Sequence, residues 1–420
     1  MAEQMKASGT EYLLDIPQSW TVKRFKYCAQ ICNGAEYADI EVDEGGYPVI
    51  GSGGEFARAS KFCYEGESVL LGRKGTIDKP LYINGAFWCV DTMFYTKVKQ
   101  EMNVRFLYYC TLCFRFDYYV TSTALPSMTQ KDLGSEMVAV PSQIEQSKIA
   151  DYLDNQCNKI DSIIADIEKQ IDVLQQYKKS LITETVTKGL DQSVPMKNSG
   201  ISWVGEIPEH WGLKRLKFML EKCTDNMRVG PFGSTLAGND FTNEGKWVYN
   251  QRVVLDNNFE EADTFVSEEK YHELKGFYVR EGDMLITTRG TIGKVAIVPK
   301  GAEEGILHPC IIRFRIDPQI MIPDLLKLIF NESDFAKDQF VLMSNATTIE
   351  VIYSYSLKDI YLPVIPMPEQ EYIYRYLRDK CNIINEILSE KQKALELMQQ
   401  HKKSLIYEYV TGKKRVKEAI

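Results

Sequence analysis

Residues 145–187 read EQSKIADYLDNQCNKIDSIIADIEKQIDVLQQYKKSLITETVT, and residues 369–411 read EQEYIYRYLRDKCNIINEILSEKQKALELMQQHKKSLIYEYVT. The two stretches align without a gap at an offset of 224 residues, and 20 of the 43 positions are identical. A shorter repeat precedes each copy, IPQSWTVKRFK at 16–26 and IPEHWGLKRLKF at 207–218. The chain is therefore expected to run as globular domain, long helix, globular domain, long helix.

Both long stretches carry mostly apolar residues at alternating steps of four and three, which is the a/d pattern of a coiled-coil seam. Each seam could pack on its own globular domain, but a stripe sustained over four heptads in both copies favours pairing of the two helices with each other. The seam positions are Leu153, Cys157, Ile160, Ile164, Ile167, Ile171, Leu174, Lys178 and Leu181 in the first copy, and Leu377, Cys381, Ile384, Leu388, Lys391, Leu395, Met398, Lys402 and Leu405 in the second.

Chain order predicts that the pair is antiparallel. About 45 helical residues at 1.5 Å each make a rod of roughly 65–70 Å. A domain of about 155 residues has a radius of gyration near 15 Å and cannot easily bridge that length. The end of the first helix and the start of the second must therefore lie together.

The expected fold class is α+β, with two similar α/β domains separated by a long antiparallel two-helix coiled coil and related by a pseudo-two-fold internal repeat. Short apolar runs bounded by glycine predict strands, and longer runs predict helices. The predicted parts are a first domain at 1–140, a long helix at 141–190, a second domain at 191–365, and a long helix with a basic tail at 366–420. The predicted strands lie at 47–54, 68–72, 283–288, 295–299 and 311–316, and the predicted helical stretches within the domains lie at 104–116 and 323–340.

Composition limits the classes of function. The chain has 420 residues and a net charge of −8, which argues against an indiscriminate coat on nucleic acid, so DNA contact would need local basic patches. The ten cysteines form no disulfide framework and, with only four histidines, no zinc-ligand pattern, so reduced core thiols and no metal are expected. No leader or membrane span is expected, which predicts a cytoplasmic protein.

Each half contains one glycine turn flanked by basic residues, GRKGTIDKP at 72–80 and TTRGTIGKV at 287–295. Such turns present donors that suit phosphates or guanine edges. The alternative of an ordinary hairpin turn with solvated charges stays open. The candidate DNA-binding residues in these turns are Arg73, Lys74, Thr76 and Lys79 in the first half, and Arg289, Thr291 and Lys294 in the second.

Polar stretches lead into each long helix, TSTALPSMTQKDL at 121–133 and SNATTIEVIYSYSLKDI at 344–360, and each is either a plain loop or a base-reading surface. The run YNQRV at 249–253 also places side by side three residue types that pair with adenine and guanine. The candidates from these stretches are Ser122, Thr123, Ser127, Asn250, Gln251, Arg252, Asn345 and Thr347.

No motif with a catalytic mechanism stands out. The chain has no GxxxxGK[ST] phosphate loop, no Asn/Asp/Ser-Pro-Pro-Tyr/Phe element of an amino-methyltransferase and no nucleophile elbow. The chain is therefore expected not to be an enzyme.

The whole chain resembles the specificity (S) subunit of type I restriction–modification enzymes. The residues that carry the resemblance are the IPxxW openings at 16–20 and 207–211, GPFGSTL at 230–236, RGTIGK at 289–294, and YPVIGSGG with GRKGTI in the first half. To these are added the elements that open the helices, PSQIEQSKIADYL at 141–153 and PMPEQEYIYRYL at 366–377.

The resemblance implies two target-recognition domains that each read one half of a bipartite site in double-stranded DNA, and two conserved helical regions on which two methyltransferase (M) subunits dock. Restriction (R) subunits complete such complexes, which are bacterial or archaeal. S-adenosylmethionine, ATP and Mg are then expected in the partner subunits, and no cofactor in this chain. GTIDK at 75–79 lacks the second glycine of GTIGK, and SNATTIE at 344–350 does not match LPSMTQKDL. The site is therefore expected to be asymmetric.

Two alternatives remain open from the sequence. The chain could be the recognition subunit of a related bipartite-site system that cuts on both sides of its site. It could also be a coiled-coil scaffold that holds two ligand-binding domains and never contacts DNA, which the net charge of −8 favours slightly.

Overall fold

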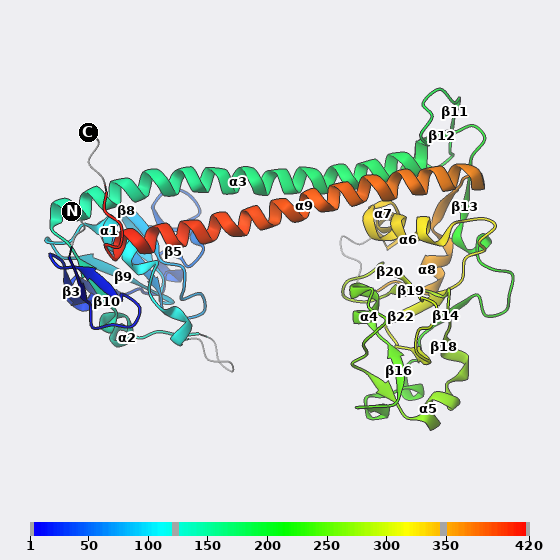
Figure 1. Cartoon of the computed structure of the whole chain (residues 1–420), viewed down its shortest axis with the longest axis horizontal. Helices are drawn as coiled ribbons and strands as arrows, with labels where there is room; N and C mark the ends of the chain where they lie inside the picture. The colour runs from blue at the N-terminus through cyan, green and yellow to red at the C-terminus, as the bar shows by residue number, and fades with distance from the viewer. Residues whose placement is uncertain (1–3, 120–125, 345–350, 417–420) are drawn as a thin grey trace. The chain divides into compact units, whose positions relative to one another are not determined.

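The computed structural model describes residues 4–119, 126–344 and 351–416. The chain divides into two compact units, unit 1 with residues 1–169 and 392–420 and unit 2 with residues 170–391. The long helices α3 (Gln143–Lys188) and α9 (Met367–Val410) each contribute one segment to both units (Figure 1). With mainly antiparallel sheets and separate helices, the protein has an α+β fold.

Unit 1 is built on a six-stranded sheet of order β4-β9-β7-β8-β5-β6. All neighbouring strands in it are antiparallel except β5 and β8, which are parallel. Two short antiparallel ladders, β1 with β2 and β3 with β10, complete the strands. The strands are β1 (Met5–Ala7), β2 (Asp15–Pro17), β3 (Thr21–Arg24), β4 (Ala29–Asn33), β5 (Tyr47–Gly51), β6 (Gly54–Ala59), β7 (Tyr64–Gly72), β8 (Leu81–Cys89), β9 (Met93–Val98) and β10 (Met137–Val140).

Helix α1 of unit 1 packs against β7 and β8 of this sheet. Buried side chains of α1, α3 and α9 form one core with Trp20 and Phe25, because the apolar stripe of each helix faces the same interior. The shorter helices are α1 (Val104–Thr111), α2 (Gln130–Ser135), η1 (Phe25–Tyr27), η2 (Ala38–Ile40) and η3 (Phe116–Tyr119).

Unit 2 has two larger sheets, a four-stranded one of order β14-β22-β19-β20 and a five-stranded one of order β15-β17-β16-β21-β18. Only β16 and β21 pair in parallel within them. The strands are β11 (Met196–Asn198), β12 (Glu206–Pro208), β13 (Gly212–Arg215), β14 (Met227–Val229), β15 (Phe241–Thr242), β16 (Lys246–Tyr249), β17 (Phe265–Val266), β18 (Tyr278–Val279), β19 (Met284–Thr287), β20 (Val295–Ile297), β21 (Gly305–Leu307), β22 (Ile311–Phe314) and β23 (Tyr361–Val364).

The helical stretch predicted at 323–340 is divided in two. Ser333 is extended, with φ −127° and ψ 163°, and its hydroxyl donates to the Ile329 carbonyl at 2.6 Å. This side chain replaces a backbone donor at the end of α6, so the chain turns there. The helices of unit 2 are α4 (Gln251–Asp256), α5 (Glu268–Glu273), α6 (Pro323–Glu332), α7 (Phe335–Ser344), α8 (Ser354–Asp359), η4 (Leu216–Phe218), η5 (Gly233–Thr235), η6 (Gly238–Asp240) and η7 (Lys275–Phe277).

The start of each long helix is held to its unit by the same types of contact. In unit 1 the Trp20 indole donates to Glu145 at 3.2 Å, and in unit 2 the Trp211 indole donates to Glu369 at 2.9 Å. The buried amides of Gln146 and Gln370 lie one residue further along α3 and α9 and accept backbone N–H groups at 2.8 and 2.9 Å. The short IPxxW repeat therefore serves to anchor the helix starts.

The predicted seam residues of α3 and α9 are buried or half-buried, whereas most of their neighbours in the middle of each helix are exposed. In unit 1 Tyr152 packs against Tyr409 with ring centroids 4.5 Å apart, and Asp161 pairs with Lys402 at 2.6 Å. These contacts run in opposite sequence order, so the two segments of unit 1 are antiparallel. In unit 2 the seam residue Lys178 donates to the amide oxygen of Asn385 at 2.7 Å.

Both long helices end at a glycine. Gly189 follows α3 with φ +75°, and Gly412 lies just beyond the end of α9 with φ +74°. Glycine adopts this left-handed conformation without the steric penalty of a Cβ atom, which explains why the helices stop there.

Candidate DNA-contacting surfaces

The basic turn of unit 1 leaves the end of β7 and pairs with the segment that precedes α2. Lys74 forms a β-bridge with Ser127, and the Met128 N–H donates to the Arg73 carbonyl at 2.9 Å. The Gly75 N–H donates to the Pro126 carbonyl at 2.8 Å, and Gly75 has φ +79°. The fold therefore brings together two stretches predicted separately as DNA-binding, 72–80 and 121–133.

The basic turn of unit 2 joins β19 to β20 and is bonded in the same way. Arg289 forms a β-bridge with Val351, and the Ile352 N–H donates to the Thr288 carbonyl at 2.9 Å. Gly290 has φ +61°. Lys74 and Arg289 occupy equivalent places, both directly before the GTI sequence, and both side chains are exposed.

The other residues of the unit 1 turn differ in how free their side chains are. Arg73 is half-buried, donates from Nη1 to the Asp91 carbonyl at 3.2 Å and lies over the Phe94 ring. Thr76 is half-buried, whereas Lys79 and Ser127 are exposed. Lys74 and Lys79 of this turn, with Ser127 of the paired segment, are thus the unit 1 candidates most available to a ligand.

Lys294 has a partner inside unit 2. Its ammonium group donates to the Asn331 carbonyl at 2.6 Å, in the last turn of α6, where a cation also meets the negative end of the helix dipole. Thr291 is exposed, and its carbonyl accepts the Thr287 hydroxyl at 2.7 Å. Lys294 therefore has a clear structural task in addition to the DNA contact predicted for it.

In the YNQRV run, the side chains of Asn250 and Arg252 form hydrogen bonds or ion pairs within unit 2. The Asn250 amide oxygen caps α4, and its NH₂ group donates to Asp263 at 2.6 Å. Arg252 pairs with Asp263 at 3.3 Å and with Asp256 at 3.5 Å. The Gln251 amide lies beside the basic turn and donates to the Thr291 carbonyl at 3.4 Å. This weak bond leaves Gln251 the most available of the three.

The carboxylate of Asp263 is a part of this surface that sequence reasoning missed. Hydrogen bonds from Thr264, Asn250 and Arg252 hold the pKa of Asp263 below its usual value. An ionised Asp263 thus neutralises Arg252 and fixes its position. The acidic run EEAD at 260–263 was the available signal, but nothing in its spacing from Arg252 indicated the contact.

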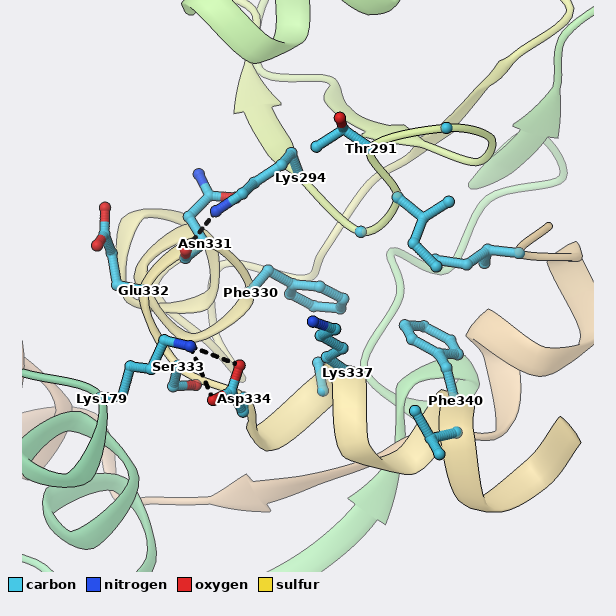
Figure 2. A pocket seen from close by; sticks show the side chains of 16 residues that line it. Lys179, Thr291, Lys294, Phe330, Asn331, Glu332, Ser333, Asp334, Lys337 and Phe340 are labelled. Carbon is cyan, nitrogen blue, oxygen red and sulfur yellow. Dashed lines mark hydrogen bonds and ion pairs between the residues drawn. The ribbon is translucent and has the colours of Figure 1, made fainter. Parts of the chain in front are cut away.

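A cavity of about 460 Å³ lies between the basic turn of unit 2, the α6–α7 junction and Lys179 of α3 (Figure 2). Lys179 pairs with Asp334 at 3.0 Å, opposite the bond between Lys294 and Asn331. Lys337, Phe330 and Phe340 also line this cavity and are labelled in Figure 2. Lys179 and Lys294 are offset by a carboxylate and a carbonyl, an arrangement that favours a structural junction over a phosphate pocket.

Four predicted site residues, Ser122, Thr123, Asn345 and Thr347, lie outside the described residues. All ten cysteines are free thiols. Within the described ranges, no group of three or more His, Cys, Asp or Glu side chains is placed to hold a metal ion. In the same ranges no helix combines the length and apolar character needed to cross a bilayer.

Comparison with known proteins decides the family. The family model described as "Type I restriction modification DNA specificity domain" matches residues 17–173 and 227–397. The chain belongs to this family. As a member of the type I restriction–modification specificity family it is a non-catalytic component, which confirms the expectation from the missing catalytic motifs.

Relatives in the specificity family match over most of the chain. The type I restriction enzyme MjaVIII specificity subunit of Methanocaldococcus jannaschii is 25% identical over 432 residues, covering 96% of this chain and 95% of the relative. The EcoBI specificity subunit of Escherichia coli is 22% identical over 392 residues, covering 86% and 79%.

One solved structure shares the fold of this specificity-family chain. It comes from work titled "Structural basis underlying complex assembly and conformational transition of the type I R-M system", and superposes with a TM-score of 0.66 at 12% identity. The match covers 95% of this chain and 99% of the other.

Proposed function

We propose that this chain is the DNA-reading subunit of a type I restriction–modification complex and that each unit reads one half of a bipartite, asymmetric site. The observation that supports it best is the repeated bonding of the basic turns. In each unit a turn with the sequence GTI pairs through its backbone with the segment before the last short helix, at 2.9 Å in both cases. Two equivalent loops on one chain suit two half-sites on one DNA.

The side chains on these equivalent frameworks differ, which supports an asymmetric site. Lys74 in unit 1 corresponds to Arg289 in unit 2, and Ser127 corresponds to Val351. A lysine and an arginine present different donor geometries to a base pair, because the guanidinium can bond in a bidentate fashion whereas the ammonium acts as a point charge. The two halves of the target are therefore expected to have different sequences.

We infer that α3 and α9 pair along their seams as an antiparallel coiled coil that sets the spacing between half-sites. The seam burial and the Asp161–Lys402 and Lys178–Asn385 contacts support this pairing. The two contacts are equivalent under the 224-residue offset of the repeat, because Lys178 corresponds to Lys402 and Asp161 corresponds to Asn385. A pseudo-two-fold internal repeat accounts for this equivalence.

The repeated helices also support docking of one partner type twice. We infer that two methyltransferase subunits bind the helical regions and that restriction subunits join this core. S-adenosylmethionine, ATP and Mg belong to those partners in this scheme, and the chain itself needs none of them. The predicted domain boundaries and the cytoplasmic location stay predictions.

Exchange of the second domain tests the proposal. A chimera that carries residues 199–362 of a relative should change one half of the methylated site and leave the other half and the gap unchanged. Methylome sequencing of a strain that carries the chimera measures this, and the reciprocal exchange of residues 1–140 is the matched control. If both half-sites changed together, or if neither changed in a stable chimera, the assignment of one unit to one half-site would be wrong.

A further inference from the structure

A basic and aromatic turn occurs once in each unit and has no role in the scheme above. It reads KRFKY at 23–27 and KRLKF at 214–218. In unit 1 it joins β3 to η1, and in unit 2 it joins β13 to η4. Both copies begin three residues after the buried tryptophan of the IPxxW repeat.

The two copies have the same backbone bonding and a buried anchor. The Phe25 N–H donates to the Glu136 carbonyl at 2.7 Å, and the Leu216 N–H donates to the Ile360 carbonyl at 2.9 Å. Phe25 and Leu216 are both fully buried. Folding therefore accounts for the central residue of each turn, whereas Lys26, Tyr27, Lys217 and Phe218 beside it are exposed.

Those surrounding residues face outward. Tyr27 is 56% exposed and Phe218 is 62% exposed, which is unusual for large aromatic side chains. The ammonium of Lys26 lies 5.1 Å from the centroid of the Tyr27 ring, and that of Lys217 lies 5.4 Å from the Phe218 ring. Each turn thus presents a lysine held against an exposed ring, in a chain whose net charge is −8.

The positions of these turns connect them to the candidate DNA surfaces. η1 packs against α2, and η4 packs against α8. Helix α2 begins at Gln130, shortly after Ser127 has bridged Lys74, and α8 begins at Ser354, shortly after Val351 has bridged Arg289. One short helix therefore separates the turn at 23–27 from the bridge between Lys74 and Ser127. In the same way, one short helix separates the turn at 214–218 from the bridge between Arg289 and Val351.

We propose that the turns at 23–27 and 214–218 bind the phosphate backbone of the DNA beside each half-site. This inference rests on the proposed function, because it requires that both units lie on DNA. Phosphates carry no sequence information, so the same contact can serve both half-sites. This explains why the turns are alike although the predicted reading residues differ between the units.

The structure also predicts that the two turns contribute unequally. In unit 2 Asp359 pairs with Arg215 at 3.3 Å and with Lys217 at 2.9 Å. The position 224 residues earlier is Ser135, which is exposed and uncharged. Among the described residues, Lys23, Arg24 and Lys26 have no carboxylate within ion-pair distance. The turn of unit 1 is therefore the more cationic of the two and should hold DNA more strongly.

The test measures how DNA affinity depends on salt, with the chain in complex with its methyltransferase subunits. Lys26→Gln should lower the slope of log K against log [salt] by roughly 1, and the triple change Lys23→Gln, Arg24→Gln, Lys26→Gln by roughly 2–3. The loss should be the same for specific and non-specific duplexes. Lys61→Gln, at an exposed lysine outside both turns, is the matched control and should leave the slope unchanged.

Two further variants exchange the residues at the equivalent positions 135 and 359. Because one should strengthen and the other weaken DNA binding, the test does not depend on loss of folding. Asp359→Ser should strengthen DNA binding and steepen the salt slope, because it removes the carboxylate that pairs with Arg215 and Lys217. Ser135→Asp should weaken binding in the same way as Lys26→Gln. Thermal unfolding of each variant shows whether its fold is retained.

Three results separate the possible failures. An unchanged salt slope in the triple variant, with weaker specific binding by Arg289→Ala, would overturn this inference and leave the proposed function intact. If the triple variant purified with fewer methyltransferase copies, the turns would belong to a protein interface, and this inference would again be wrong. If DNA binding were unchanged in both the triple variant and Arg289→Ala, the proposed function would be contradicted as well.

Discussion

Arg289 and Lys294 belong to one turn, and the structure predicts different consequences when each is replaced by alanine. The Arg289 side chain is exposed, and the β-bridge of this residue to Val351 uses only backbone atoms. Arg289→Ala should therefore leave the fold intact. If the guanidinium reads a base, its loss should cost about 1–3 kcal/mol of binding free energy, or about 5- to 150-fold in affinity, and should relax one position of the site.

Lys294→Ala should act mainly on stability. The ammonium donates to the Asn331 carbonyl at 2.6 Å in the last turn of α6. A hydrogen bond to a charged group contributes about 1.5–3 kcal/mol, and removal of a cation from a helix C-terminus costs about 0.3–1 kcal/mol. Each kcal/mol lowers Tm by roughly 2–4 °C in a domain of 150–250 residues, so a fall of several degrees is expected.

Thermal unfolding and DNA binding, measured on the same preparations, separate the two roles. Lys294→Arg keeps the charge and should recover part of the lost stability, which makes it a suitable control. The reasoning would be refuted if Lys294→Ala melted like the unmodified chain and bound DNA more weakly, because the lysine would then act on DNA and not on α6. Arg289→Ala with unchanged affinity and specificity would move base reading to other parts of the surface.

Three further predictions concern partners, spacing and pH. Co-purification with the methyltransferase should yield two copies of that subunit per chain by native mass spectrometry, and a stable one-to-one complex would contradict the repeated docking site. One heptad added after Leu174 and another after Met398 should lengthen the helices by roughly 10 Å and permit a gap up to about three base pairs longer; methylome sequencing shows the gap, and full activity on the original gap would show that other elements set the spacing. Burial alone would raise the pKa of Asp225, but hydrogen bonds and charges from Arg313 and Arg228 hold it below its usual value. The stability from Asp225 is therefore present at neutral pH and lost as the pH falls through that lowered pKa, so the Tm difference between the unmodified chain and Asp225→Asn should shrink below about pH 4.

Features that depend on local pattern could be predicted from the sequence. The heptad seam predicted which residues in the middle of α3 and α9 are buried or half-buried, because the side-chain direction in a helix repeats with a known period. The ends of both helices followed from Gly189 and Gly412, since a left-handed residue stops a helix wherever the helix lies. The family could be recognised for the same reason, as its motifs are short and ordered along the chain.

The availability of the candidate site residues was decided by tertiary contacts. Asn250 and Arg252 look like base readers in sequence, yet Asp263 engages both side chains. Lys294 reaches a carbonyl of α6 that lies 37 residues away, and Lys74 meets Ser127, which lies 53 residues further along the chain. Periodicity and turn chemistry act over a few residues, whereas a side chain is left free or engaged by whatever the fold brings beside it. The sequence by itself thus determined the helices, their ends and the family, and only the tertiary structure decided which of the predicted side chains remain available to bind DNA.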